Sequence, residues 1–258
     1  MLNKSHLLAA AFLIGFAATP ANATVYGVFS NGSGADSAAI GIIQAAGDTA
    51  TVLPDLTAAS LSGINVLFLL NSNNGGPLAG LSANAAALNS FVQGGGVFAL
   101  NDREVTDAAS TVPGATGIAF TRNTANDINP GAASVLVNGP AGVINATTLD
   151  NGSSSDHGYA AIGTLPAGAT ALLTTGDATQ AVAISYTLGA GSVYYSTIPL
   201  DYYLSSGASP AGFDAIYAPN LVAYLDTLAV PTAVPEPASF AVLGVGLLGL
   251  HMARRRAA

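Results

Sequence analysis

The feature that most constrains this chain is a nearly uncharged apolar segment close to its C-terminus. Apart from His251, residues 238–253 are apolar or small, Pro235-Glu236-Pro237 precedes them, and Arg254-Arg255-Arg256 follows them. Proline disfavours helix at the residue before it, so a helix here can begin only after Pro237. Sixteen helical residues would span about 24 Å, slightly less than a bilayer's hydrocarbon core, and arginine side chains can reach the interface. The segment therefore predicts a transmembrane helix with its arginine end in the cytoplasm and the preceding chain outside.

The N-terminus has the organisation of a secretory signal peptide. Lys4 supplies the positive charge, residues 7–18 are apolar, and Ala21-Asn22-Ala23 is a small-x-small cleavage site. We therefore expect cleavage after Ala23 and a mature chain that begins at Thr24. The expected organisation is a signal peptide at 1–23, an exported α/β domain at 24–229, a linker at 230–233 and a sorting tail at 234–258.

The tail resembles the PEP-CTERM sorting signal of Gram-negative bacteria. The residues that carry the resemblance are Val234, Pro235, Glu236 and Pro237, then the Gly/Leu-rich helix, then Arg254, Arg255 and Arg256. Such tails have also been labelled an ice-binding protein C-terminal region, a label that says nothing about ice. The resemblance implies export, anchoring in the inner membrane with the domain outside, and processing by an exosortase near Pro-Glu-Pro. It further implies a final place at the cell surface or in the matrix, and exopolysaccharide or biofilm as a partner.

The composition of the exported part excludes several classes of partner. Residues 24–233 hold thirteen Asp and Glu against two Arg, and 13 − 2 gives a net charge of −11. Such a domain repels nucleic acid and anionic lipid, so we expect neither as a partner. Cysteine is absent from the chain, which excludes disulfides, thiolate metal sites and a cysteine nucleophile.

The first half of the exported part alternates extended and helical patterns. The unbroken apolar run at 64–70 (INVLFLL) is typical of a strand buried on both faces of a parallel sheet. The expected elements are strands at 24–29, 49–53, 64–70 and 97–100 and helices at 36–46 and 82–93. This spacing predicts a parallel sheet with helices packed on it.

The second half is less regular. Residues 101–129 are polar and are expected to form loops. Further strands are expected at 134–137, 171–175, 181–186 and 192–196, and a last helix from Ser209-Pro210 to about Leu225. The turn at 187–191 joins two of these strands as a hairpin. The sequence thus predicts an α/β domain with a flavodoxin-like, mostly parallel sheet flanked by helices and a late β-hairpin.

Three sequence segments of this domain resemble the class I glutamine-amidotransferase-like superfamily. They are INVLFLLN, LNSFVQGGGVFALND and GAGSVYYSTIPLDYY. The resemblance covers most of residues 24–229 and is closest to its non-catalytic, trehalose-utilisation-like relatives. The superfamily's catalytic elbow follows the strand expected at 97–100. Here that elbow reads Asn101-Asp102-Arg103-Glu104, and no cysteine is available. We therefore expect no amidotransferase activity.

Polar residues follow several of the expected parallel strands. The carboxyl ends of such strands meet at one edge of the sheet, where ligands bind in open α/β folds. The residues expected at this edge are Ser30, Asn31, Asn71, Asn73, Asn101 and Asp102. They predict a cleft for a neutral, hydroxyl-rich ligand such as a glycan, although Asn, Ser and Gly are also ordinary turn residues.

Two groups of residues raise the question of catalysis. Asp102, Glu104 and Asp107 form an acidic cluster that could act as acid and base or bind a divalent cation, or simply form a solvated loop. Asp156 and His157 resemble a general-base pair, but the sequence has no G-x-S-x-G elbow to supply a nucleophile. We therefore expect no catalytic residues, no cofactor and no metal.

Three hypotheses about function follow from the sequence. The first is a non-enzymatic envelope or surface protein that the exosortase and the secretion machinery deliver. The second is a module that binds carbohydrate or a partner in the expected cleft. The third is a divergent envelope hydrolase that uses Asp102, Glu104 or His157. The missing nucleophile favours the first two.

Overall fold

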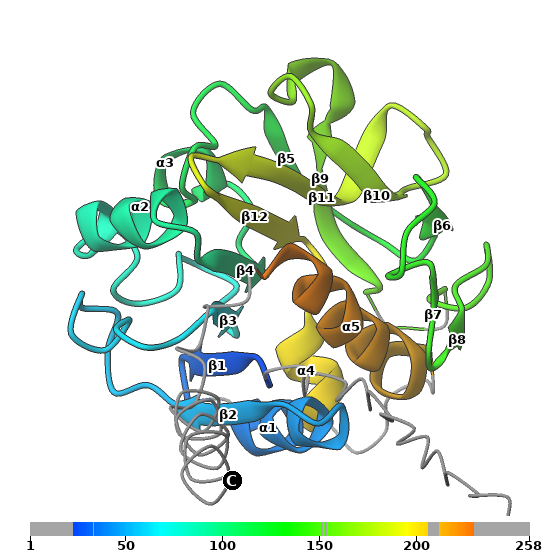
Figure 1. Cartoon of the computed structure of the whole chain (residues 1–258). Coiled ribbons are helices and arrows are strands. Elements are labelled where there is room, and N and C mark those ends of the chain that lie inside the picture. Colours follow the sequence, from blue (N-terminus) through cyan, green and yellow to red (C-terminus); the bar gives the residue numbers. More distant parts are fainter. Residues whose placement is uncertain (1–22, 33, 151, 153, 206–211, 230–258) are drawn as a thin grey trace, which may run out of the picture.

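A computed structural model of the chain describes residues 23–32, 34–150, 152, 154–205 and 212–229. These residues form a central sheet with helices on both of its faces (Figure 1). This arrangement confirms the expected α/β class. Apart from Ala23, the expected signal peptide lies outside the described residues, as do the linker and the sorting tail. No helix in the described part of the chain is long and apolar enough to cross a membrane.

Five strands form the parallel part of the sheet. Their bounds are Val25–Ser30 (β1), Thr49–Val52 (β2), Val66–Leu70 (β3), Val97–Asn101 (β4) and Gly191–Ser196 (β12). They lie in the order β2-β1-β3-β4-β12, which is the order of flavodoxin-like doubly wound sheets. Every residue of β3 and β4 is buried, which explains their nearly unbroken apolar sequences.

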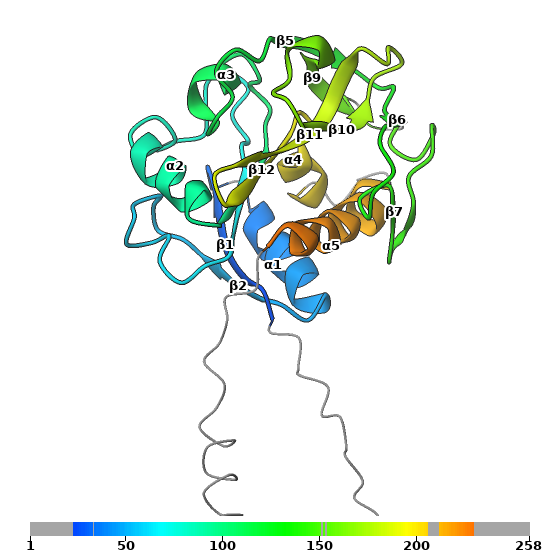
Figure 2. The same ribbon diagram turned by 45° about the horizontal axis from the view of Figure 1, so that its top comes forward.

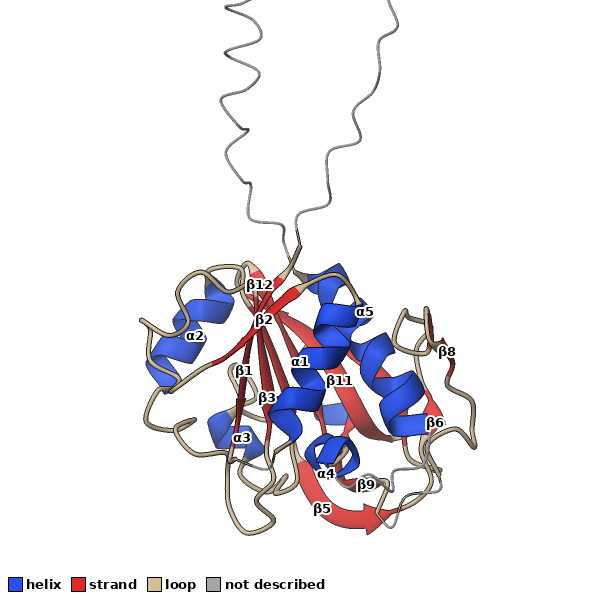
Figure 3. Cartoon of the chain, turned by 90° about the horizontal axis from the view of Figure 1, so that it is seen from below, coloured by secondary structure: helices blue, strands red, loops and turns tan. Residues whose placement is uncertain are grey.

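Two helical layers cover this sheet. One face carries α1 (Ala35–Ala45), α4 (Leu200–Ser205) and α5 (Ala218–Leu228), and the other carries α2 (Ala85–Gln93) and α3 (Ala108–Thr111). Figure 3 shows the two layers on opposite sides of the strands. The α2 residues Leu88 and Val92, four apart, are fully buried, because side chains at i and i+4 share one face of a helix. A π-helical turn at Phe213–Tyr217 leads directly into α5.

An antiparallel extension continues the sheet beyond β12. The strand β11 (Gln180–Leu188) pairs with β12, which confirms the expected late hairpin. Beyond β11 the sheet branches. One branch holds β10 (Thr170–Thr174) and β6 (Asn129–Pro130), and the other holds β9 (Asp156–Ala161) and β5 (Phe120–Ala125).

The second half departs from the sequence prediction in several places. The stretch 101–129, expected as loop, contains α3 and β5, and β9 was also not expected. The prediction of a strand at 134–137 is wrong. This segment forms a turn before the two-residue strands β7 (Asn138–Gly139) and β8 (Gly142–Val143).

The side chain of Asn220 explains why residues 134–137 leave the sheet. This α5 residue is fully buried. Its Nδ2 donates to the carbonyl oxygens of Leu136 (3.2 Å) and Gly142 (2.9 Å), and its Oδ1 accepts the Ala141 N–H (3.0 Å). The segment therefore satisfies backbone groups against a helix instead of a neighbouring strand.

A buried hydroxyl cluster fixes α5 against the sheet. The Tyr217 hydroxyl lies 2.7 Å from the Tyr194 hydroxyl, donates to Asn101 Oδ1 at 3.0 Å and lies 3.2 Å from Ser196 Oγ. All four residues are fully buried. Removing one hydroxyl here leaves polar partners without water to replace it.

We expect Tyr217→Phe to lower the free energy of unfolding by about 1–3 kcal/mol, because it leaves several buried partners unsatisfied. Tyr186→Phe is the control, since its hydroxyl donates to the Pro113 carbonyl oxygen (2.6 Å) alone, and it should cost about 1 kcal/mol. Urea unfolding of residues 24–229 measures both. Equal losses in the two variants would contradict the prediction.

Candidate functional site

Four of the six expected cleft residues meet at the carboxyl edge of the parallel strands. Asn31 Nδ2 donates to Asn71 Oδ1 at 3.1 Å, and the Asn73 N–H donates to the same oxygen at 3.0 Å. Asn71 Nδ2 donates to Asp102 Oδ1 at 2.7 Å and to the Gly76 carbonyl oxygen at 3.2 Å. Because these amides satisfy one another, they order the loops after β1, β3 and β4.

The other two expected residues turn away from this group. Ser30 Oγ accepts the Gly32 N–H at 3.0 Å and thereby closes a local turn. Asn101 is fully buried and accepts the Tyr217 hydroxyl in the core beneath α5. The structure therefore uses the expected cleft residues mainly to build the edge of the sheet.

Asp102 organises the elbow that follows β4. Its carboxylate accepts the N–H groups of Glu104 (3.1 Å) and Val105 (3.2 Å) and the Tyr195 hydroxyl (3.0 Å), in addition to Asn71. The side chain is only 4% exposed. A buried carboxylate with four donors is fully occupied, so Asp102 positions other groups and is not free to act as an acid or base.

The elbow contains a strained residue. Val105 has φ 67°, a left-handed conformation that β-branched residues avoid. Strain of this kind costs about 1–3 kcal/mol and persists only where the surroundings enforce it. Here the Asp102 carboxylate supplies the enforcement, and the sharp turn leaves Arg103 at the rim of the sheet.

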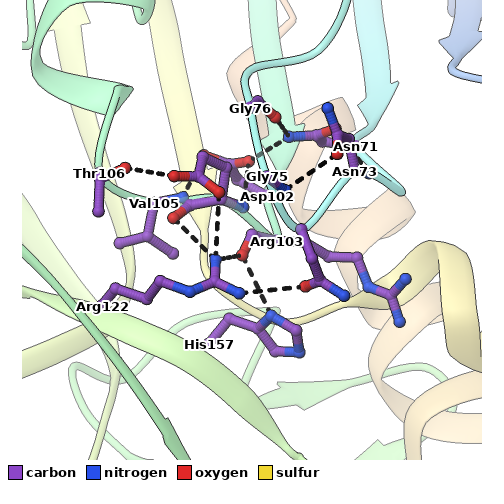
Figure 4. Close-up of polar contacts among 12 residues, drawn as sticks. Asn71, Asn73, Gly75, Gly76, Asp102, Arg103, Val105, Thr106, Arg122 and His157 are labelled. Carbon is purple, nitrogen blue, oxygen red and sulfur yellow. Dashed lines mark hydrogen bonds and ion pairs between the residues drawn. The ribbon is translucent and has the colours of Figure 1, made fainter.

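Three basic side chains meet at the elbow (Figure 4). The Arg103 carbonyl oxygen accepts a hydrogen bond from Arg122 Nη1 and lies 3.1 Å from His157 Nδ1. Arg122 also donates to the Glu104 carbonyl oxygen (3.0 Å), pairs with the Glu104 carboxylate (3.4 Å) and donates through Nη2 to Asn74 Oδ1 (3.2 Å). Arg122 thus clamps the elbow from the side of β5.

The strands β5 and β9, which sequence reasoning missed, bring two of these groups into place. The His157 N–H donates to the Thr197 carbonyl oxygen (2.9 Å), and Thr197 Oγ1 donates to the Gly158 carbonyl oxygen (2.6 Å), so the start of β9 is held at the end of β12. Arg122 on β5 lies opposite Gly158 in the register. A side chain at Gly158 would collide with the Thr121 carbonyl oxygen, so glycine permits this close pairing.

These residues line a pocket of about 420 Å³ at the carboxyl edge. Its lining consists of Asn74, Arg103, Arg122, Thr124, Ser154, His157, Pro199 and Tyr202. None of these described lining residues is acidic. Arg103, Arg122 and His157 are also the only basic side chains between residues 24 and 229. A domain with a strong net negative charge therefore gathers all of its basic side chains at one place.

His157 enters this pocket as a neutral group. Burial, reinforced by the charges of Arg103 and Arg122, lowers the pKa of His157 to about 4. A carbonyl oxygen can only accept, so the contact with Arg103 places the proton on Nδ1 and leaves Nε2 unprotonated. At neutral pH His157 therefore offers a hydrogen-bond acceptor and not a charge.

Asp201 and Tyr202, at the start of α4, complete the surroundings of Arg103. Arg103 Nε lies 3.5 Å from Asp201 Oδ1, and its guanidinium carbon lies 5.4 Å from the centroid of the Tyr202 ring. Burial raises the pKa of Asp201 to about 6, although the Arg103 charge opposes the rise. Tyr202 is 40% exposed, one of few large hydrophobic side chains exposed among the described residues.

The expected alternatives for catalysis find little support in this geometry. Glu104 is engaged with Arg122, and the described residues contain no group of three or more His, Asp or Glu that could hold a metal ion. Asp156 and His157 are neighbours in β9, so their side chains point to opposite faces of the strand. Asp156 Oδ1 instead accepts the Gly158 N–H at 3.2 Å.

Comparison with a family model identifies the C-terminus. Residues 233–257 match the PEP-CTERM protein-sorting motif, which confirms the interpretation of the tail. The motif implies an exported protein that an exosortase sorts to the cell surface. No curated protein is significantly similar to the chain.

Solved structures resemble the α/β part at low sequence identity. An exo-β-1,4-mannosidase, Op5Man5, from Opitutaceae bacterium strain TAV5 is 15% identical with a TM-score of 0.50, over 81% of this chain and 36% of the mannosidase. The cytoplasmic protein STM1381 from Salmonella typhimurium LT2 is 10% identical with a TM-score of 0.49, over 80% and 100%. A protein assigned as a GMP synthase subunit from Thermoplasma acidophilum is 12% identical with a TM-score of 0.47, over 80% and 95%.

These likenesses concern the fold alone. This chain spans about a third of the mannosidase, so the activity of that enzyme does not transfer to it. The GMP synthase protein and STM1381 both have TM-scores below 0.5, so neither likeness supports a conclusion about this chain.

We expect Asp156→Asn to stabilise the domain at pH 8. Burial and the charge of Asp127 raise the pKa of Asp156 to about 7, and its Oδ2 has no hydrogen-bond partner among the described residues. The unfolded carboxyl ionises near pH 4 and the folded one near pH 7, so stability falls as pH rises between these values. Removing the ionisation should add about 1–3 kcal/mol at pH 8 and little at pH 4.

Melting temperatures of wild type and variant at pH 4, 6 and 8 test this expectation. The contribution of His157 runs in the opposite direction, because its lowered pKa costs stability as pH falls from 6.5 to 4, but it cancels in the comparison. Asp214→Asn, which changes an exposed carboxylate, is the control and should shift the melting temperature little. A gap between wild type and Asp156→Asn that is constant with pH would rule out this explanation.

Proposed function

We propose that this chain is an exported, exosortase-sorted protein of the cell envelope or surface that acts by binding, without catalysis, in an exopolysaccharide or biofilm matrix. The observation that carries the proposal is the match of residues 233–257 to the PEP-CTERM sorting motif. Its partners are then the secretion machinery, the exosortase, the membrane through the helix at 238–253, and the matrix.

The proposal divides the chain into four parts. The signal peptide at 1–23 directs export, the α/β domain at 24–229 is the functional unit, the linker at 230–233 separates it from the membrane, and the tail at 234–258 is the sorting signal. In this scheme the tail first anchors the protein in the inner membrane with the domain outside. Processing then delivers the domain to the surface or the matrix.

The described domain begins and ends on the side opposite to the pocket. Near the start of β1, the Tyr26 hydroxyl donates to Asp226 Oδ1 at 2.7 Å, close to the end of α5. The beginning and the end of the described domain therefore lie together at the amino edge of the parallel strands (Figure 2). The pocket lies at their carboxyl edge, so an anchored domain would present it away from the membrane.

The pocket around Arg103 supports the binding role. It lies at the carboxyl edge of a doubly wound sheet, where ligands of such folds bind. Its polar side chains and one exposed tyrosine suit a hydroxyl-rich ligand such as a glycan.

A hydrolase remains the second candidate. The observation that favours it is His157, whose neutral ring lines the pocket together with the hydroxyl-bearing residues Ser154 and Thr124. In the described part of the chain, however, no hydrogen bond joins His157 to a hydroxyl that could serve as nucleophile. We therefore place binding before hydrolysis.

We expect replacement of Pro235-Glu236-Pro237 by three alanines to block processing while anchoring survives. The change removes the proposed exosortase recognition site but leaves the apolar segment and the arginines. Fractionation and mass measurement in a host that carries the exosortase should find full-length protein in the inner membrane.

Replacement of Arg254, Arg255 and Arg256 by glutamine is the matched comparison. Each arginine contributes about 1 kcal/mol of attraction to an anionic leaflet and holds the helix end in the cytoplasm. Loss of all three should impair anchoring and orientation, unlike the alanine variant. Normal trimming and release of the alanine variant would overturn the sorting proposal.

A further inference from the structure

We propose that the pocket at the carboxyl edge binds an acidic saccharide, with the sugar carboxylate at the guanidinium of Arg103 and the sugar ring against Tyr202. This inference rests on the binding role proposed above and names the chemical class of the ligand. It replaces the expectation, drawn from the asparagines at this edge, that the ligand is neutral.

The charged residues around the pocket favour an acidic ligand. All basic side chains between residues 24 and 229 line this pocket, and none of its described lining residues is acidic. The two carboxylates that pair with the arginines are Glu104 and Asp201, which are mostly buried and do not line the pocket. A ligand that approaches from outside therefore meets cationic and neutral groups first.

Arg103 retains hydrogen-bond donors for a ligand. Its Nη1 donates to the Ser72 carbonyl oxygen at 3.2 Å. Its Nε is buried in the ion pair with Asp201, outside hydrogen-bonding geometry, so the donors left for a ligand are the N–H groups of Nη1 and Nη2. Nη2 makes no hydrogen bond to the described residues. The planar guanidinium fork matches a carboxylate bidentately.

Arg122 and His157 hold Arg103 in position. Both contact the Arg103 carbonyl oxygen, so the main chain of the elbow is fixed from the side of β5 and β9 (Figure 4). Arg122 also adds positive charge to the pocket wall, and its Nη2 donates a hydrogen bond to Asn74 Oδ1. The geometry is set before a ligand arrives, which reduces the entropic cost of binding.

Tyr202 and the neutral lining select a sugar over a simple anion. The Tyr202 ring is 40% exposed beside Arg103, and such rings offer an apolar surface with a polar tip. Thr124, Ser154 and the unprotonated Nε2 of His157 provide donors and acceptors for hydroxyl groups. The volume of about 420 Å³ lies within the range of small-molecule sites.

The net charge of the domain disfavours densely charged ligands. With −11 between residues 24 and 233, polyphosphates and nucleic acids are repelled. An acidic saccharide can place a single carboxylate at the arginines, with neutral hydroxyl groups beside it. The combination of one cationic pocket and an acidic surround thus fits this class of ligand.

Calorimetric titration of the full-length chain in neutral detergent tests the inference. The probes are a digalacturonate, the matched neutral disaccharide in which CH2OH replaces each carboxylate, and inorganic sulfate and phosphate. We expect the digalacturonate to bind at least tenfold more tightly than the neutral disaccharide and than either inorganic anion. We also expect its affinity to fall with added salt.

Two variants examine the two halves of the site. Arg103→Lys keeps the charge but removes the planar fork, and it should weaken digalacturonate binding at least tenfold. Tyr202→Ala removes only a partly exposed ring, so it should keep the fold and still weaken binding severalfold. Val143→Ala, an exposed residue of β8 outside the pocket (55% exposed), is the control and should bind as wild type does. If circular dichroism shows that Arg103→Lys is unfolded, Tyr202→Ala decides alone.

Each alternative outcome has a distinct meaning. Equal binding of the neutral disaccharide overturns the acidic ligand but keeps a saccharide-binding module. Inorganic anions that bind as tightly as the digalacturonate overturn the saccharide and leave a simple anion site. Absence of binding by all probes, or wild-type affinity in Tyr202→Ala, overturns the inference. None of these outcomes affects the sorting proposal, which is measured separately by processing of the tail.

Discussion

The carboxylate of Asp102 is the interaction on which the rest of the site depends. It joins the loop after β3, through Asn71, to the elbow after β4 and to Tyr195 of β12. A buried carboxylate must satisfy its oxygens with donors, and only a sharply turned elbow brings two backbone N–H groups to it. The left-handed conformation of Val105 follows from this requirement. The position of Arg103 follows in turn, so a single buried charge sets the geometry of the pocket.

The scarcity of charge explains the arrangement of the remaining ionisable groups. Burying an ion without a partner is costly, so both arginines are paired, Arg103 with Asp201 and Arg122 with Glu104. A buried carboxyl with too few hydrogen-bond donors around it has a raised pKa. Burial raises the pKa of Asp156 and of Asp201 in this way. His157 responds in the opposite direction and stays neutral. The site therefore combines fixed guanidinium charges with neutral polar groups.

The sequence predicted the parallel half of the fold because its central strands β3 and β4 are buried on both faces and read as apolar runs. It missed β5 and β9, whose sequences FTRNTA and DHGYAA are short and polar. These strands exist through pairing with each other and with β11, which local patterns do not report. The pocket was missed for the same reason, because it unites Arg103, Arg122 and His157 only after β5 and β9 form. The available signal was that an acidic domain contains only two arginines.

The described domain begins and ends at one edge of the sheet, and the pocket lies at the opposite edge. The strand β1 starts at the amino edge, and α5, which runs antiparallel to it, ends there. The hydrogen bond between Tyr26 and Asp226 joins these two ends. In the proposed organisation, the linker at 230–233 would span at most about 14 Å and would hold an anchored domain close to the membrane. Its charge of −11 is repelled by an anionic surface over a Debye length of about 8–10 Å. A domain tethered through the edge where it begins and ends would therefore present the pocket at its far side.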